Sequence, residues 1–99
     1  MPYVIMFHDD PGVLDRKKEL RAVHLEYVNK NAPRIIASGG LFPEDDDFPT
    51  GGLIILDTDS RQDAIDYIEN DPFFLNGIFT HYTVDRWRKF VFDHKPVNA

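Results

Sequence analysis

The apolar residues of the chain fall into short runs of strand length, separated by longer stretches of mixed polarity. Four runs rich in β-branched, aromatic or aliphatic residues predict strands. They are Tyr3–His8, Arg34–Ser38, Leu53–Leu56 and Ile78–Val84. The first and third are apolar at odd and even positions alike, which predicts that both faces of the sheet are covered.

The stretch from Asp15 to Asn29 predicts the first helix, because its larger side chains recur at helical spacing. The residues that share this predicted face are Leu20, Val23, His24 and Tyr27. We expect Ala32 to leave the helical region because it precedes Pro33. Asn31 is then a candidate for a left-handed cap at the helix end.

A second helix is predicted after Ser60, a good N-cap residue, with Asp63 placed to interact favourably with the helix dipole. Its buried face is expected to consist of Ala64, Ile65, Tyr67 and Ile68. Asp71 and Pro72 suit the N-cap and first position of another short helical turn, which Gly77 would end. Beyond the fourth strand, Trp87–Phe92 is expected to form an extended tail.

The segment Leu41–Gly52 has the composition of a loop. It contains two prolines and the acidic run Glu44–Asp47. The run lacks the regular ligand spacing and the glycine of a calcium-binding loop, so we interpret the segment as a solvated loop.

The predicted element order is β-α-β-β-α-β, which is typical of a ferredoxin-like α+β sandwich with four antiparallel strands and helices on one face. Such a monomer leaves the other face of the sheet bare. Because the first and third strands are apolar on both sides, we expect a second copy of the chain to cover that face. The expected assembly is a homodimer formed sheet to sheet.

Composition narrows the class of partner. The 99 residues suit a single domain spanning positions 1–99, and 42% of them are hydrophobic. A net charge of −6 argues against binding to nucleic acid or to an anionic membrane. The chain has no cysteine, no apolar stretch long enough to span a membrane and no signal-peptide pattern at its start. We therefore expect a cytoplasmic protein.

The sequence contains no nucleophile elbow, phosphate loop, dinucleotide fingerprint or zinc motif, so no cofactor and no metal are expected. His8, His81 and His94 have no partner at ligand spacing and are interpreted as structural or exposed. His24 differs because it replaces an aliphatic residue on the apolar face of the first helix. A histidine in such a place is either a core residue with satisfied hydrogen bonds or part of a site.

The chain resembles the YCII-related family. The resemblance rests on R-x-x-H-L on the first helix, on a small-residue turn, on Asp-Pro-Phe followed by glycine, and on a late aromatic residue. In this chain these are Arg21 to Leu25, Ser38-Gly39-Gly40, Asp71-Pro72-Phe73 with Gly77, and Trp87. The similarity runs from the first strand to the tail and implies a dimeric α+β barrel with a His-Asp pair in a cleft.

By this resemblance the pair is His24 and Asp71. A carboxylate that accepts a proton from one imidazole nitrogen orients the ring and leaves the other nitrogen as a base. Arg21, one turn before His24, is a candidate ligand for a substrate carboxylate or phenolate. Ser38 and the amides of Gly39 and Gly40 are candidate donors to a developing oxyanion.

Three functions remain open. The leading hypothesis is cofactor-free proton transfer, meaning isomerisation or elimination, on a small acidic or aromatic substrate. The second is a dimeric module that binds a small molecule without converting it, in which Asp71 serves only as a helix cap. The third, cofactor-free oxygenation, rests on analogy between folds alone.

Overall fold

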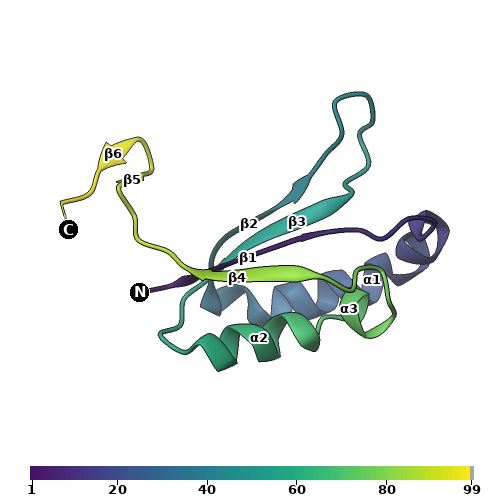
Figure 1. Cartoon of the computed structure of the whole chain (residues 1–99), viewed down its shortest axis with the longest axis horizontal. Helices are drawn as coiled ribbons and strands as arrows, with labels where there is room; N and C mark the ends of the chain where they lie inside the picture. Colours follow the sequence, from purple (N-terminus) through teal and green to yellow (C-terminus); the bar gives the residue numbers. More distant parts are fainter. Residues whose placement is uncertain (99) are drawn as a thin grey trace.

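The sheet consists of four antiparallel strands in the order β2-β3-β1-β4 (Figure 1). The computed structural model describes residues 1–98. The strands are β1 (Tyr3–His8), β2 (Ile35–Leu41), β3 (Gly51–Leu56) and β4 (Tyr82–Arg86). The apolar runs that predicted cover on both faces form β1 and β3, the two central strands, which also have paired neighbours on both edges.

Three α-helices accompany the sheet: α1 (Leu14–Asn31), α2 (Arg61–Glu69) and the short α3 (Pro72–Leu75). Figure 1 shows α1 and α2 side by side across one face of the sheet. The order of elements and strands is that of a ferredoxin-like α+β fold, as predicted. No helix within residues 1–98 is long and apolar enough to cross a membrane.

The core lies between the sheet and the helices. Alternate residues of β1 (Tyr3, Ile5 and Phe7) point toward the helices and are buried. From the helix side, α2 contributes Ala64, Tyr67 and Ile68, three of the four residues predicted for its inner face. The hydroxyl of Ser60 accepts a hydrogen bond from the Asp63 amide, so the predicted N-cap is confirmed.

The inner face of α1 differs from the prediction. Leu20 and Tyr27 pack against the core, but Val23 is 45% exposed. With 100° of rotation per residue, Val23 lies on the far edge of the Leu20 and Tyr27 stripe, whereas Lys17 and His24 lie on its opposite edge. Helix α1 therefore packs on the core through Leu20 and Tyr27, and Val23, at the edge of this stripe, stays exposed.

The end of α1 also differs. Asn31 and Ala32 both have right-handed helical backbone angles, so the prediction of a left-handed cap at Asn31 is wrong. The chain instead continues into a 3₁₀ turn, η1 (Ala32–Arg34), with Pro33 inside it. The restriction on a residue before proline is a preference, and here the tighter turn accommodates Ala32 in the helical region.

The fourth strand begins at Tyr82, later than predicted. Ile78 and Phe79 are fully buried, but they lie in the connection from α3 to β4. The amide of Ile78 donates to the Phe73 carbonyl, and the Asp10 amide donates to the Ile78 carbonyl. Ile78 and Phe79 are apolar because they fill the core. A buried connection therefore has the same apolar sequence pattern as a buried strand.

The extended tail predicted at Trp87–Phe92 leads into a hairpin, and only its last two residues form a strand there. Residues Val91–Phe92 (β5) pair antiparallel with Lys95–Pro96 (β6) across a turn in which Asp93 and His94 have positive φ. Figure 1 shows this hairpin standing away from the sheet and helices. Phe90 is 72% exposed at its base. The hairpin therefore presents apolar side chains that its own chain does not cover.

Candidate active site

His24 and Asp71 are brought together by the packing of α1 against α3. The ring nitrogen Nδ1 of His24 lies 3.0 Å from Oδ1 of Asp71, across 47 positions of sequence. Asp71 is 1% exposed, whereas the His24 side chain is 20% exposed. The carboxylate is thus enclosed by protein, and the imidazole separates it from solvent.

The same carboxylate oxygen caps α3. The Phe73 amide donates a 2.8 Å hydrogen bond to Oδ1 of Asp71, with Pro72 at the first helical position. The short helix that the sequence predicted is therefore present, and it holds the carboxylate in place. One oxygen accepts from the backbone amide and faces the imidazole, so capping and pairing with His24 do not compete.

The orientation of the imidazole is fixed from its face as well as from its edge. The His24 and Phe73 rings stack with centroids 3.9 Å apart and an interplanar angle of 8°. Because Asp71 is a carboxylate acceptor, the Nδ1–H tautomer satisfies the contact and leaves Nε2 with a free lone pair. A ring held in this way costs little further entropy when a ligand binds.

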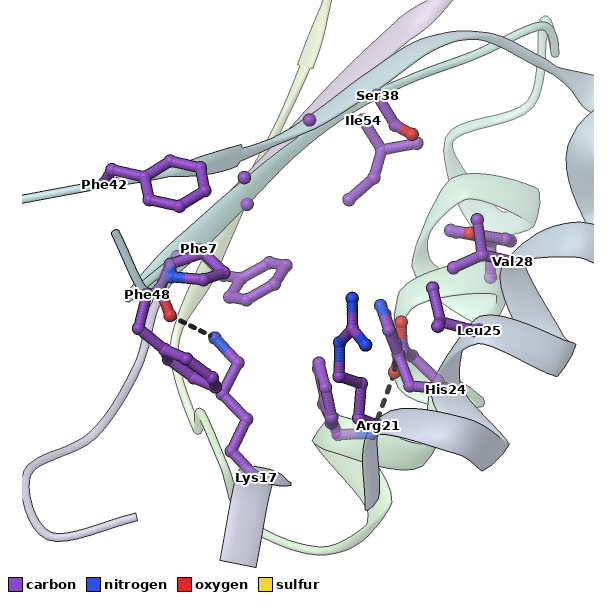
Figure 2. Close-up of a pocket in the computed structure, with 18 of the residues that line it drawn as sticks. Phe7, Lys17, Arg21, His24, Leu25, Val28, Ser38, Phe42, Phe48 and Ile54 are labelled. Carbon is purple, nitrogen blue, oxygen red and sulfur yellow. Dashed lines mark hydrogen bonds and ion pairs between the residues drawn. The ribbon is translucent and has the colours of Figure 1, made fainter. Parts of the chain in front are cut away.

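A cavity of about 580 Å³ lies beside this pair, between α1 and the sheet. Figure 2 shows Arg21, His24, Leu25 and Val28 along one wall and Phe7, Ser38 and Ile54 across from them. The volume is in the range of small-molecule pockets. Aromatic residues contribute much of the lining, namely Phe7, Phe42, Phe48, Tyr67 and Phe73.

Arg21 lines the cavity one turn before His24, as the sequence spacing predicted. Within residues 1–98 its guanidinium makes no hydrogen bond and no ion pair. A guanidinium in that state can give its donors to an anionic ligand without first breaking a protein contact.

The small residues Ser38, Gly39 and Gly40 also line the cavity, but they belong to β2 and do not form the turn that was expected. Their partners are Ile54, Leu53 and Gly52 of β3. Amides of a strand lie in the plane of the sheet, whereas the cavity lies on its face. These residues therefore leave room in the cavity because their side chains are small or absent, and Ser38 adds a hydroxyl.

Space for the neighbouring side chain is required at Gly52. A Cβ atom there would come within 2.8 Å of the Phe7 ring, and one at Gly40 would come within 2.9 Å of Pro49. Both distances are shorter than real contacts of a Cβ atom. The glycines thus allow Phe7 and the β2–β3 loop to form the walls of the cavity.

Lys17 is a cavity residue that sequence reasoning missed. It is only 4% exposed, and its Nζ donates to Oδ2 of Asp9 and to the Pro49 carbonyl, each at 2.7 Å. The other carboxylate oxygen, Oδ1 of Asp9, is buried without a partner in the described part of the chain. Lys17 therefore links α1 to the loop between β2 and β3 through the Pro49 carbonyl, and the Asp9 carboxylate compensates its positive charge.

The β2–β3 loop also contributes side chains to the cavity, which the sequence did not indicate. Glu44, Asp45 and Asp46 are exposed, in agreement with a solvated loop. Phe42 and Phe48 nevertheless line the cavity (Figure 2), and so does the carboxylate residue Asp47. The segment is thus a loop with an exposed acidic run, as predicted, but Phe48 packs beside the ammonium groups of Lys17 and Lys18 on α1 and is only partly solvated.

No three His, Asp or Glu side chains of residues 1–98 come close enough together to hold a metal ion. His8, His81 and His94 are each exposed and lie outside the cavity lining. The ionisable groups at the cavity are thus those of Lys17, Arg21, His24, Asp47, Tyr67 and Asp71.

Comparison with known proteins agrees with this architecture. The structure of 5-chloro-2-hydroxyhydroquinone dehydrochlorinase from Burkholderia phenoliruptrix AC1100, solved in complex with 2,5-dihydroxybenzoquinone, matches with a TM-score of 0.79. The two chains are 30% identical over 89% of this chain and 94% of that one. A search of the curated proteins gave no match.

The family model described as the YCII-related domain matches residues 1–88, which include every strand of the sheet and all three α-helices. The β5–β6 hairpin lies beyond the matched region. Over most of its length, therefore, this chain belongs to the YCII-related family.

Proposed function

We propose that this protein is a cofactor-free enzyme in which His24 transfers a proton to or from a small, hydroxylated aromatic or quinoid substrate. The observation that carries the proposal is the 3.0 Å contact between His24 Nδ1 and Asp71 Oδ1 at the edge of the cavity. A buried carboxylate on one ring nitrogen leaves the other nitrogen as a base of defined direction.

The substrate class follows from the cavity walls. Aromatic side chains, among them Phe7 and Phe48, line the cavity, and Arg21 offers a guanidinium with free donors. Such a site favours a planar ring that carries an anionic oxygen. The dehydrochlorinase with 30% identity, which was solved with 2,5-dihydroxybenzoquinone, supports the same class.

The proposed reaction is an elimination. Nε2 of His24 accepts a proton from a ring hydroxyl, and Arg21 stabilises the oxyanion that develops. The electron pair moves into the ring, and the carbon that bears the leaving group takes the proton from the imidazolium, which gives a keto tautomer. The leaving group, chloride in the case of a chlorinated hydroxyhydroquinone, then departs with its bonding electrons while a second ring hydroxyl gives its proton to Nε2 and on to water, so that the products are a hydroxyquinone, chloride and one proton.

We further propose that the active form is a homodimer. The sheet face opposite the helices carries Val4, Met6, Leu53 and Ile55, which alternate with the buried residues of β1 and β3. Met6 is 37% exposed. An apolar stripe across the two central strands is typical of a surface that packs on a second sheet.

The enzyme proposal is tested by incubating the purified protein anaerobically with 5-chloro-2-hydroxyhydroquinone and measuring chloride release. We expect one chloride per substrate consumed, at a rate above that of the buffer, without uptake of oxygen. If the protein binds 2,5-dihydroxybenzoquinone but converts no chlorinated or isomerisable ring in a panel of such compounds, the enzyme proposal is wrong and the protein is a binding module.

A further inference from the structure

The Tyr67 hydroxyl has an unusual place in the fold. Tyr67 belongs to α2, is 3% exposed and lines the cavity. Among residues 1–98 its hydroxyl has no hydrogen-bond partner, yet it is not fully enclosed, since Oδ1 of Asp9 is the one enclosed side-chain oxygen or nitrogen there that lacks a partner. An oxygen without a partner that is not fully enclosed retains contact with solvent. Because Tyr67 lines the cavity, that contact is through the cavity.

Tyr27 provides a direct contrast. Its ring stacks on that of Tyr67 with centroids 5.3 Å apart. Its hydroxyl, however, donates a 2.7 Å hydrogen bond to the backbone carbonyl of Tyr67, and Tyr27 does not line the cavity. Of the two neighbouring phenols, one is committed to the fold and the other is left free.

We propose that the Tyr67 hydroxyl donates a hydrogen bond to an oxygen of the bound ligand. This inference rests on the proposed function, because it assumes that the cavity holds an oxygenated ring. It assigns to Tyr67 a second polar contact besides Arg21, contributed by a different helix. The site would thereby select rings with oxygen substituents at two positions over rings with one.

The ionisation of Tyr67 suits a donor. Burial raises the pKa of its hydroxyl above the ordinary value, and the nearby Asp71 carboxylate raises this pKa further. The phenol therefore keeps its proton throughout the neutral range and offers it to an anionic oxygen. Hydrogen bonds to charged groups are the stronger ones.

The test compares two variants that each lose one phenol oxygen, Tyr67→Phe and Tyr27→Phe. The affinity of each for 2,5-dihydroxybenzoquinone is measured by isothermal titration calorimetry. We expect Tyr67→Phe to weaken binding by about 10- to 100-fold, the usual worth of a hydrogen bond to a charged group. Tyr27→Phe should bind within about twofold of wild type, since it removes no donor from the cavity.

A second measurement needs no variant at position 67. In wild-type protein labelled with [¹³Cζ]tyrosine, the signals of three of the four tyrosines are assigned with Tyr3→Phe, Tyr27→Phe and Tyr82→Phe, which leaves that of Tyr67. Saturation with the same quinone should shift the Tyr67 signal, while the Tyr27 signal stays in place. If wild type binds but the two variants bind alike and no tyrosine signal moves, the inference about Tyr67 is wrong. If wild type does not bind the quinone at all, the proposed substrate class is wrong, and the inference falls with it.

Discussion

The carboxylate of Asp71 faces His24 and caps α3 through the same oxygen, Oδ1. The hydrogen bond that begins the helix therefore also sets the position of the imidazole. This arrangement explains how a four-residue helix can matter for a site: α3 holds Asp71 and Phe73, which together fix the edge and the face of the His24 ring.

Arg21 should control affinity for anionic rings. We expect Arg21→Met to weaken binding of 2,5-dihydroxybenzoquinone by about tenfold or more, because a charge-assisted hydrogen bond contributes about 1.5–3 kcal/mol. Arg21→Lys should bind the quinone with an affinity between those of wild type and Arg21→Met, since lysine keeps the charge but loses the bidentate geometry. Lys30→Met, which removes one charge from the last turn of the same helix, is the matched control and should bind like wild type. Equal binding by the Arg21 and Lys30 variants would contradict the role.

Lys17 should stabilise the fold. Its ammonium group is buried with the carboxylate of Asp9, so Lys17→Met leaves a buried charge without its partner. Breaking a buried pair in this way costs about 3–5 kcal/mol, and we expect a loss of that size in the free energy of unfolding measured with urea. The exposed neighbour Lys18 provides the control, with an expected loss below about 1 kcal/mol. Similar losses for the two variants would show that the buried pair contributes little.

Stability should fall at high pH because of Tyr82. Burial, and then the 2.6 Å hydrogen bond to Oε2 of Glu69, raise the pKa of Tyr82 to about 12 from its ordinary value of 10.0. A raised pKa means that the folded state holds this proton more tightly than the unfolded chain. The contribution is complete below pH 10.0 and is lost as the pH rises toward 12.

This loss can be measured as urea midpoints between pH 9 and 12, roughly the window set by the two pKa values. Tyr82→Phe should make the decline shallower, although Tyr27 and Tyr67, whose pKa values are also raised, keep part of it. A decline of the same slope in wild type and Tyr82→Phe would rule out the contribution of Tyr82.

The open sheet face should hold the homodimer together. We expect light scattering to give twice the mass of one chain for wild type and the mass of a single chain for Met6→Asp. A carboxylate at this position would be buried against a second apolar sheet without a partner. Leu75→Asp, at a 64% exposed position on α3, should remain dimeric. A monomeric wild type, or a dimeric Met6→Asp variant, would contradict the proposed interface.

Much of the fold was predictable because it depends on local patterns. The apolar runs of β1 and β3 indicate central strands wherever they occur, and Ser60 and Asp71 cap their helices through residues two or three positions away. These signals are contained in a few neighbouring residues. They do not require knowledge of what packs above them.

The rest depends on contacts that sequence spacing does not encode. Lys17 is buried because Asp9 and Pro49, 8 and 32 positions away, supply its acceptors; in the pattern of α1 it is simply a polar residue. Ile78 and Phe79 imitate a strand because a buried connection needs the same side chains as a buried strand. Phe48 of the β2–β3 loop lines the cavity beside Lys17, a contact that the composition of the loop does not predict.

The proposed site falls between these cases. The helical spacing placed Arg21 one turn from His24, but only the resemblance to a family suggested Asp71 as the partner. The free Tyr67 hydroxyl gave no signal at all, because its pattern position matched a core residue. Packing decides which oxygen faces the core and which faces the cavity.

The central claim is that His24, held by Asp71, moves the proton. The most direct measurement is the single-turnover rate of chloride release from 5-chloro-2-hydroxyhydroquinone by wild type, His24→Ala and Asp71→Asn under anaerobic conditions. Asp71→Asn keeps an oxygen to cap α3 but removes the charge beside the ring. We predict rates lower by about 10²- to 10⁴-fold for His24→Ala, the usual range for loss of a general base, and a smaller but clear loss for Asp71→Asn. Variants that bind the substrate and release chloride as fast as wild type would contradict the claim.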